Sequence, residues 1–311
     1  MKAAKEIFAD GTFEMVKQTM FTQAWVMVVR HPTLGVSIPC AFFLLPDKHT
    51  DSYKMVMSTL KELEVLGPDL IHLDFESAVI KAVKFVWPNT NISGCDTHWK
   101  RKIRDHQKET GLIGFINKEP VVQHFVRKLW SLVFVPVNQV HDICKEFLEK
   151  MPEMLENDSD NENDDAQEYN NAMSNFLNYF EQTWLGQVNK RTGNMGKPKF
   201  ALDVWNHFDD IQEGSEDITS NRSEAWNSVS KLCIPMNPSI WVVLSSLQGE
   251  EGLARAKLAE ALSGSPPSDP NPSRTRARVA KYEALRRIVD SWGTVNNDTY
   301  IESVAGHFND L

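Results

Sequence analysis

The sequence is poor in cysteine and has no long apolar run. Its four cysteines, Cys40, Cys95, Cys144 and Cys233, are widely scattered, which excludes a disulfide framework and fits a reducing compartment. No stretch approaches the roughly 18 apolar residues of a membrane-spanning helix, so we expect no membrane partner. The first residues lead directly into a predicted strand, and we therefore expect no signal peptide.

Basic residues are missing from one acidic segment, which accounts for most of the net charge. Residues 151–170 contain eight acids and no Lys or Arg, and removing these eight charges from the net charge of −9 leaves −1. Such a run predicts a solvated acidic loop. Because DNA binding depends on local basic faces, the overall charge does not exclude a nucleic-acid partner.

What the chain does contain is a core-forming composition, with 41% hydrophobic residues. The first 110 residues predict three antiparallel strands followed by alternating helices and parallel strands, which is a mixed α/β sheet. It is also the element order of the ribonuclease H-like fold, in which the ends of the first and fourth strands are neighbours. The expected strands are 6–13, 21–30, 36–45, 70–73 and 92–94, and the expected helices are 51–66, 78–86 and 99–110.

The remainder of the chain is patterned mainly for helices. Helical apolar spacing recurs between residues 111 and 185, and again over 239–262. Residues 263–273 have the composition of a linker, and a basic helix is expected over 274–292. Four tryptophans with apolar neighbours are expected in the core: Trp184, Trp205, Trp226 and Trp241.

Two acids that close apolar segments carry the strongest chemical signal. Asp10 ends the segment from Ile7, and Asp74 ends the strand 70–73. An acid at the tip of a buried strand is costly unless it binds a metal or moves a proton. Carboxylates are preferred Mg²⁺ ligands, and two-ion phosphoryl transfer commonly uses three of them. The residues alone leave the third acid open among Glu213, Glu216, Asp217 and Glu224.

Each of these acids also has a purely structural interpretation. Asp10 precedes a glycine and can begin a turn, whereas Asp74 can cap the helix that follows it. Glu76 fits a first-turn helix acid better than a ligand, and Glu224 fits an exposed helical acid.

Nine segments occur in a fixed order along the chain and together resemble a known family. They are ADGTF (9–13), FTQAWVMVV (21–29), AFFLLPDKHTDSY (41–53), HLDFESAVIKAVKFVWPN (72–89), GCDTHWKRKI (94–103), YFEQTWLG (179–186), PKFALDVWNHFD (198–209), NRSEAWNSVSK (221–231) and NPSIW (237–241). This ordered set resembles the transposases of Mutator-like elements (MULEs), which are DDE-type enzymes with a ribonuclease H-like core. The resemblance covers most of residues 6–260.

The resemblance implies a set of functional residues. It implies that Asp10, Asp74 and Glu224 are the catalytic acids that hold two Mg²⁺ or Mn²⁺ ions, and it places the family's Cys-x-x-His signature on Cys95 and His98. The implied activity is DNA cleavage and strand transfer, with terminal repeats and target DNA as substrates. A homodimer and a nuclear location are expected from this activity.

The resemblance also implies a domain organisation. Residues 1–110 would form the first part of the ribonuclease H-like core, and 111–212 a large all-α insertion containing the acidic loop 151–170. Residues 213–262 would return to the core with the third acid, and 263–311 would be a linker and basic helix.

Two basic clusters are candidate DNA contacts near this site. One comprises Lys100, Arg101, Lys102 and Arg104, which fit a solvated helix face nearly as well. The other comprises Lys190, Arg191, Lys197 and Lys199 in a Gly-rich loop, which can equally be a connector.

Departures from the family pattern keep other functions open. The family has Thr-Asn-Asn before the third acid and Gly-Trp-His after it, whereas residues 219–227 read TSNRSEAWN. This drift, and the lack of a zinc-finger module ahead of the first strand, favour a domesticated or truncated derivative that binds DNA or protein without catalysis. A ribonuclease H-like exonuclease would need a second acid near Asp10, which Glu14 supplies imperfectly. Cys95 and His98 form a single pair, too few for structural zinc, and His98 is either a phosphate or water contact or a structural histidine.

Overall fold

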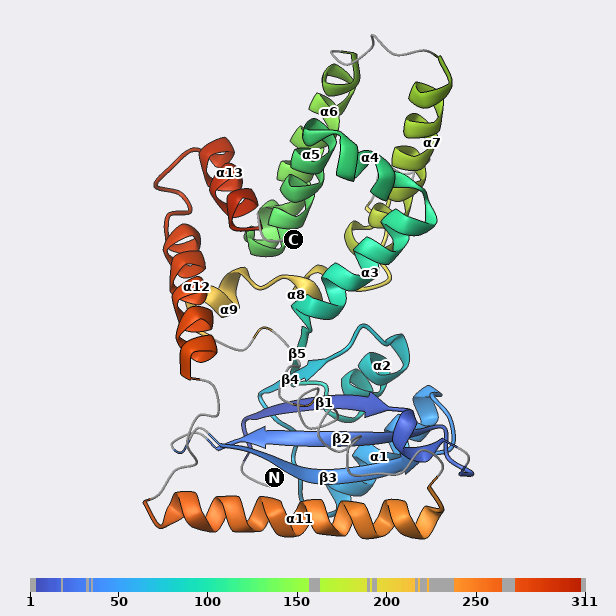
Figure 1. The fold of residues 1–311 in the computed structure, drawn as a ribbon, viewed down its shortest axis with the longest axis vertical. Coiled ribbons are helices and arrows are strands. Elements are labelled where there is room, and N and C mark those ends of the chain that lie inside the picture. The colour runs from blue at the N-terminus through green and yellow to red at the C-terminus, as the bar shows by residue number, and fades with distance from the viewer. Residues whose placement is uncertain are drawn as a thin grey trace. The chain divides into compact units, whose positions relative to one another are not determined.

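The computed structural model describes residues 4–17, 19–31, 34, 36–156, 163–188, 191, 195–215, 218, 223, 238–264 and 272–308. These residues form two compact units (Figure 1). Unit 1 comprises Met1–Cys95 and Thr219–Asn271, and unit 2 comprises Asp96–Ile218 and Pro272–Leu311. The domain boundaries expected at residues 110, 212 and 262 stay predictions.

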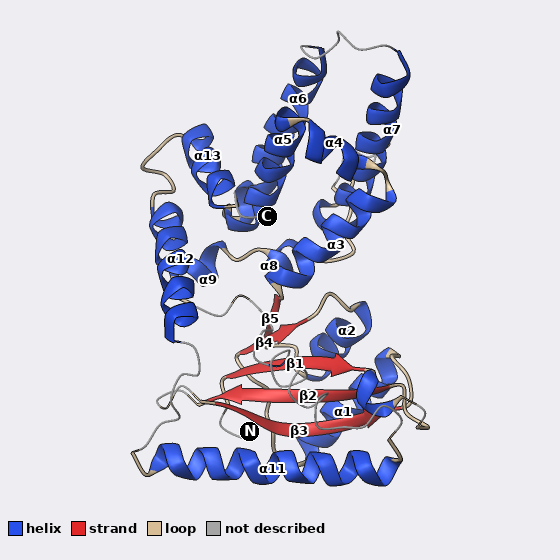
Figure 2. Cartoon of the chain, viewed as in Figure 1, coloured by secondary structure: helices blue, strands red, loops and turns tan. Residues whose placement is uncertain are grey.

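Unit 1 contains a five-stranded mixed sheet in the order β3-β2-β1-β4-β5 (Figure 2). β1 pairs antiparallel with β2 and parallel with β4, and β4 pairs parallel with β5. All five predicted strands are confirmed, and this mixed α/β architecture is compatible with the ribonuclease H-like fold. The strands are β1 (Glu6–Thr12), β2 (Gln23–Arg30), β3 (Ser37–Leu45), β4 (Leu70–Leu73) and β5 (Asn91–Gly94).

The sequences of β2 and β3 explain their places in the sheet. β2 lies between two partners and is buried over residues 23–28. β3 lies at the edge, where Pro39, which cannot donate a ladder hydrogen bond, is tolerated. The pairing of β2 with β3 shifts register between Met27 and Val28, and Val28 is the residue opposite Pro39. An edge position and a register shift are both typical of a proline within a strand.

Among its described residues, unit 1 has three helices of ten or more residues beside the sheet. α1 (Thr50–Glu62) and α2 (Ser77–Val86) pack against each other. α11 (Ile240–Leu262) runs along β3 and places Val243 and Leu247 in one apolar cluster with Val16 of the short helix η1 (Glu14–Val16) (Figure 1). The Ser239 hydroxyl accepts a hydrogen bond from the Val242 N–H, which caps the start of α11.

Unit 2 is helical over its described residues, with an aromatic centre. The Trp99 ring is stacked on Trp205 at 5.6 Å between centroids, and it meets Trp184 edge-on at 6.2 Å. Trp184 and Trp205 are fully buried as expected, whereas Trp241 of α11 in unit 1 is 73% exposed and is not a core residue. Trp226 lies outside the described residues. The helices are α3 (Asp96–Glu109), α4 (Leu112–Lys118), α5 (Pro120–Ser131), η2 (Leu132–Phe134), η3 (Val137–Gln139), α6 (Val140–Glu156), α7 (Asn163–Phe180), η4 (Glu181–Leu185), α8 (Leu202–Trp205), α9 (Phe208–Gln212), α12 (Pro272–Asp290) and α13 (Asn297–His307).

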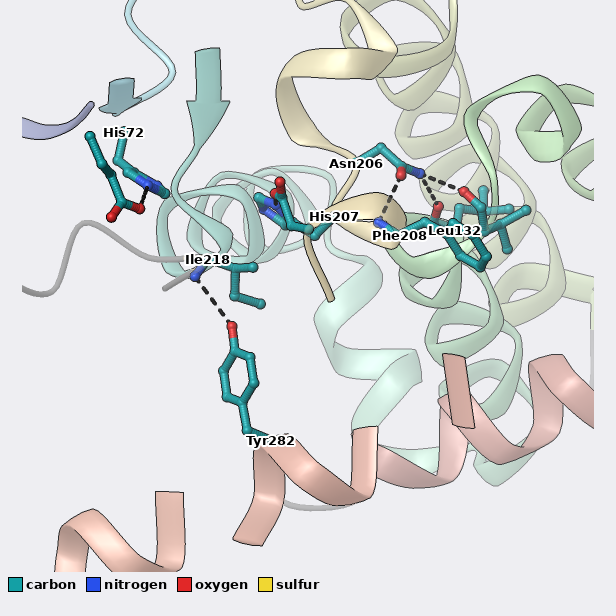
Figure 3. A network of polar contacts seen from close by, with 10 residues as sticks. His72, Leu132, Asn206, His207, Phe208, Ile218 and Tyr282 are labelled. Carbon is teal, nitrogen blue, oxygen red and sulfur yellow. Dashed lines mark hydrogen bonds and ion pairs between the residues drawn. The ribbon is translucent and has the colours of Figure 1, made fainter. Parts of the chain in front are cut away.

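Buried polar groups join distant segments within unit 2 (Figure 3). The Asn206 amide donates to the carbonyl oxygens of Leu132 and Val135 at 3.1 and 2.7 Å. The Tyr282 hydroxyl on α12 accepts a hydrogen bond from the Ile218 N–H at 3.2 Å. Because a buried amide left without partners is costly, these bonds fix how the segments meet.

The prediction of an acidic loop over residues 151–170 is wrong at both ends of this segment, which are helical. α6 continues to Glu156 and α7 begins at Asn163, so only residues 157–162 lie outside the described part. Met, Glu and Leu are good helix formers, and acids in the first turn of a helix interact favourably with its dipole. Acidity alone therefore did not distinguish loop from helix. No helix of the described residues is long and apolar enough to cross a membrane.

Candidate functional site

The register between β1 and β4 determines where the two predicted aspartates lie. Phe8 stands opposite His72 in this parallel pair, and their rings are stacked 4.3 Å apart. Asp10 and Asp74 each follow two residues later. Because successive residues of a strand alternate between faces, Asp10 shares the sheet face of Phe8. The pairing itself ends at Phe8 and His72, and the two aspartates beyond it line one pocket.

A pocket opens where the two strands separate. The pairing of β1 with β4 ends at Phe8, while its pairing with β2 continues to Thr12. A pocket of about 90 Å³ lies at this point, within unit 1. Three acids and one lysine line it: Asp10, Asp74, Glu76 and Lys48. The other lining residues are Ala9, Gly11, Phe13, Gln23, Trp25, Leu73 and Val79.

Local backbone geometry sets the two aspartates. Asp10 is half-buried, and its Oδ1 accepts a hydrogen bond from the Gly11 N–H at 2.7 Å. Asp74 directly follows β4, and its carbonyl accepts a 2.7 Å hydrogen bond from the Glu76 N–H in a tight turn. The N-cap residue of α2 is Glu76, so Asp74 is not at the N-cap position that was its structural alternative.

Glu76 is the pocket residue that the sequence analysis missed. It was expected to be an ordinary first-turn acid, but it occupies the N-cap of α2 and makes no side-chain capping bond. Its Oε1 instead accepts a hydrogen bond from the Tyr53 hydroxyl of α1 at 3.2 Å. The only signal in the sequence was its position two residues after Asp74.

Lys48 supplies a positive charge to the pocket wall. Its Nζ lies 3.8 Å from the centre of the Phe13 ring, a cation–π contact between two residues that line the same pocket. Both side chains are exposed. The pocket thus combines carboxylates, which suit a hard divalent cation, with a lysine that suits a phosphate oxygen.

Comparison with known families gives a match over the first third of the chain. Residues 7–102 match the MULE transposase domain. The matched segment contains all five strands, both pocket aspartates and the Cys-x-x-His pair. It confirms the resemblance to MULE transposases over this segment. No curated protein matches the chain.

The third acid expected from the MULE resemblance lies outside the described residues. This applies to Glu224, and also to Glu216 and Asp217. The remaining candidate, Glu213, is the C-cap of α9 in unit 2. Among the residues that the structure describes, no three His, Cys, Asp or Glu side chains are arranged to hold a metal. Asp10 and Asp74 have the oxygen donors that Mg²⁺ prefers, and they offer two of the three ligands expected.

The Cys-x-x-His pair of the MULE segment spans the end of β5 and the start of α3. Cys95 is fully buried, and its N–H donates to the Leu73 carbonyl at 2.9 Å, which aligns it with the end of β4. Burial of this kind fits the structural role expected for the cysteine. His98 lies in the first turn of α3, and its role as a site residue stays a prediction.

The basic cluster after His98 is divided between two environments. Lys100 makes an ion pair with Asp96 of the same helix, with 2.7 Å between its Nζ and Asp96 Oδ2. Its Nζ also lies 4.7 Å from the centre of the ring of Phe308, the residue that follows α13. Exposed side chains make up the rest of both predicted basic clusters: Arg101, Lys102, Arg104, Arg191, Lys197 and Lys199, with Lys190 outside the described residues. Lys100 therefore has a structural role within unit 2.

Proposed function

We propose that this chain carries the catalytic core of a DDE-type transposase that cuts DNA and transfers strands of a Mutator-like element. The observation that supports it most is that Asp10 and Asp74 line one pocket, which lies where the pairing of β1 with β4 ends and falls inside the MULE-matched segment. In this proposal Glu224 is the third carboxylate. It would join the two aspartates as a ligand of two Mg²⁺ or Mn²⁺ ions.

The proposed chemistry is two in-line displacements at phosphorus. In the first, water attacks a phosphodiester at the element's end, and the bond to the 3′-oxygen breaks to leave a 3′-hydroxyl. In the second, that hydroxyl attacks a target phosphodiester, the bond from this phosphorus to the target's own 3′-oxygen breaks, and the new phosphodiester forms while a 3′-hydroxyl is left on the target strand. The ions, when bound, would favour deprotonation of the attacking oxygen and stabilise the leaving one. Lys48 would contact a phosphate oxygen at the pocket mouth.

The proposed partners follow from this chemistry. Terminal-repeat and target DNA would contact the exposed cations of α3 and of the loop that ends at Lys199, because phosphate contacts position a duplex. Cutting two element ends calls for two active sites, so we propose a homodimer. A DNA substrate of this kind implies a nuclear location.

A derivative that binds DNA or protein without catalysis is the second candidate. The specific observation in its favour is the altered sequence around Glu224, where TSNRSEAWN replaces the flanks of the family. If this segment no longer presents a carboxylate to the pocket, Asp10 and Asp74 alone would hold ions weakly.

Strand joining tests the proposal directly. A labelled 3′-hydroxyl oligonucleotide would be incubated with plasmid DNA and Mn²⁺, with wild type, Asp74→Asn and Asp69→Asn. Asp69 is an exposed acid just before β4, which makes it a matched control. We expect joining by wild type and Asp69→Asn, and background levels with Asp74→Asn. Equal joining by Asp74→Asn would overturn the assignment of the site, and DNA binding without joining by folded wild type would favour the second candidate.

A further inference from the structure

A chain of side-chain hydrogen bonds runs through three elements to the pocket. The Gln23 amide of β2 donates to the Tyr53 hydroxyl of α1, and this hydroxyl donates to Glu76 Oε1 at the start of α2. Gln23 and Tyr53 are each 1% exposed, whereas Glu76 is only half-buried. Two buried residues therefore hold a third that lines the pocket.

The chain has a defined direction. Burial raises the pKa of Tyr53 well above its usual range, so its hydroxyl keeps its proton at neutral pH. The amide nitrogen of Gln23 can only donate, and the tyrosine oxygen accepts from it. The single hydroxyl proton is then directed to Glu76, which acts as an acceptor.

The chain begins with a close approach to the backbone of β1. A Cβ added to Gly11 would lie 2.7 Å from Gln23 Oε1, a distance too short for real contacts. Gly11 is the neighbour of Asp10, so the Gln23 side chain lies directly against the strand that supplies the first aspartate, and only a glycine at position 11 leaves room for it.

The way Glu76 is held makes a purely structural role a poor explanation. As the N-cap residue of α2 it makes no side-chain capping bond, so it does not stabilise the helix in the usual way. The Tyr53 hydroxyl that contacts it is uncharged, and Glu76 is the third carboxylate of a pocket that also contains Asp10, Asp74 and Lys48.

We propose that Glu76 contacts the hydrated side of the divalent cation at this site, and that Tyr53 is the residue that positions it. This inference rests on the proposed function. Mg²⁺ keeps several of its waters when bound, and these waters donate hydrogen bonds to nearby carboxylates. An outer role also agrees with the arrangement of the described residues, in which no three acids form a direct metal centre.

Mn²⁺ affinity, measured by isothermal titration without DNA, tests this inference. The full chain would be compared with Tyr53→Phe, Glu76→Gln and the double variant. Controls are Tyr169→Phe in unit 2 and Glu62→Gln, an exposed acid of α1. We expect about tenfold or more weaker binding for each single variant, as for other outer-shell residues, and unchanged binding for the controls. The double variant should bind no more weakly than Glu76→Gln, because Tyr53 acts through Glu76.

The outcomes separate this inference from the proposed function. If Asp74→Asn abolishes Mn²⁺ binding but Tyr53→Phe and Glu76→Gln bind as wild type, the role of Glu76 is overturned and the metal site stands. If Asp74→Asn binds Mn²⁺ as wild type does, the proposed site itself fails. Should Tyr53→Phe not fold, Glu76→Asp replaces it, because it keeps the charge but withdraws the carboxylate from Tyr53. Wild-type affinity in Glu76→Asp would contradict the proposal.

Discussion

Phe8 and His72 stand opposite each other on adjacent parallel strands, with ring centroids 4.3 Å apart and ring planes 4° from parallel. His72 is further fixed by Glu6, whose Oε1 lies 2.8 Å from its Nε2 (Figure 3). A slip of one residue would place these rings on opposite faces of the sheet. The stacked pair thus fixes the register that brings Asp10 and Asp74 to the same pocket.

Replacing Phe8 with alanine should destabilise unit 1 strongly. Phe8 is completely buried, packs with Val26 and Val28, and stacks on His72. Removal of a buried phenylalanine typically costs about 3–5 kcal/mol of unfolding free energy. Urea denaturation would measure the loss. Phe85→Ala is the control, since Phe85 is 70% exposed and should cost less than about 1 kcal/mol. Similar losses for the two variants would contradict the role of Phe8 in the core.

Lys100 and Arg101 are neighbours in sequence but should respond to mutation in different ways. Lys100→Ala leaves the buried Asp96 without its ion-pair partner and should cost about 1–3 kcal/mol of stability. Arg101→Ala should leave stability within about 0.5 kcal/mol, because the side chain is exposed. It should lower DNA affinity and reduce the slope of log affinity against log salt by about 0.9.

Chemical denaturation and fluorescence anisotropy over a salt series would measure these two effects. An unchanged salt slope in Arg101→Ala would exclude this residue as a phosphate contact. Unchanged stability in Lys100→Ala would show that its contacts with Asp96 and Phe308 contribute nothing to unit 2.

Two thiols, that of the buried Cys144 and that of the half-buried Cys40, should be unreactive at mildly alkaline pH. Burial raises the pKa of Cys144 to about 12 and that of Cys40 to about 11. Since only the thiolate reacts, and both pKa values lie above pH 8, less than about 1% of either thiol is ionised there. Iodoacetamide labelling followed by peptide mapping should show both sites protected in native protein and labelled in guanidinium. Labelling of native Cys144 at the rate of a free thiol would refute its burial.

Much of unit 1 could be predicted from sequence because its signals are local. The five strands are short apolar runs bounded by turns, and Asp74 directly follows the run of β4, whereas Asp10 lies inside β1, two residues before its end. Pro39 likewise marked an edge strand by its missing N–H donor. Each of these features depends on a few consecutive residues, and each was found where it was expected.

Features that depend on contacts between distant residues were missed. Glu76 is an ordinary helix-start acid until Tyr53, from another helix, is known to hold it. Tyr300 of α13 donates a hydrogen bond from its hydroxyl to the carbonyl of Phe134, which is far away in the sequence. None of these partners can be recognised from sequence spacing.

Anomalous diffraction from crystals soaked in Mn²⁺ tests the central claim most directly, which is that Asp10 and Asp74 together bind a divalent cation. The account predicts an anomalous peak in the pocket where the pairing of β1 with β4 ends, at about 2.1 Å from a carboxylate oxygen of each aspartate. The same peak should be missing from crystals of Asp74→Asn. A pocket without a peak in wild-type crystals, at Mn²⁺ concentrations that support DNA joining, would contradict it.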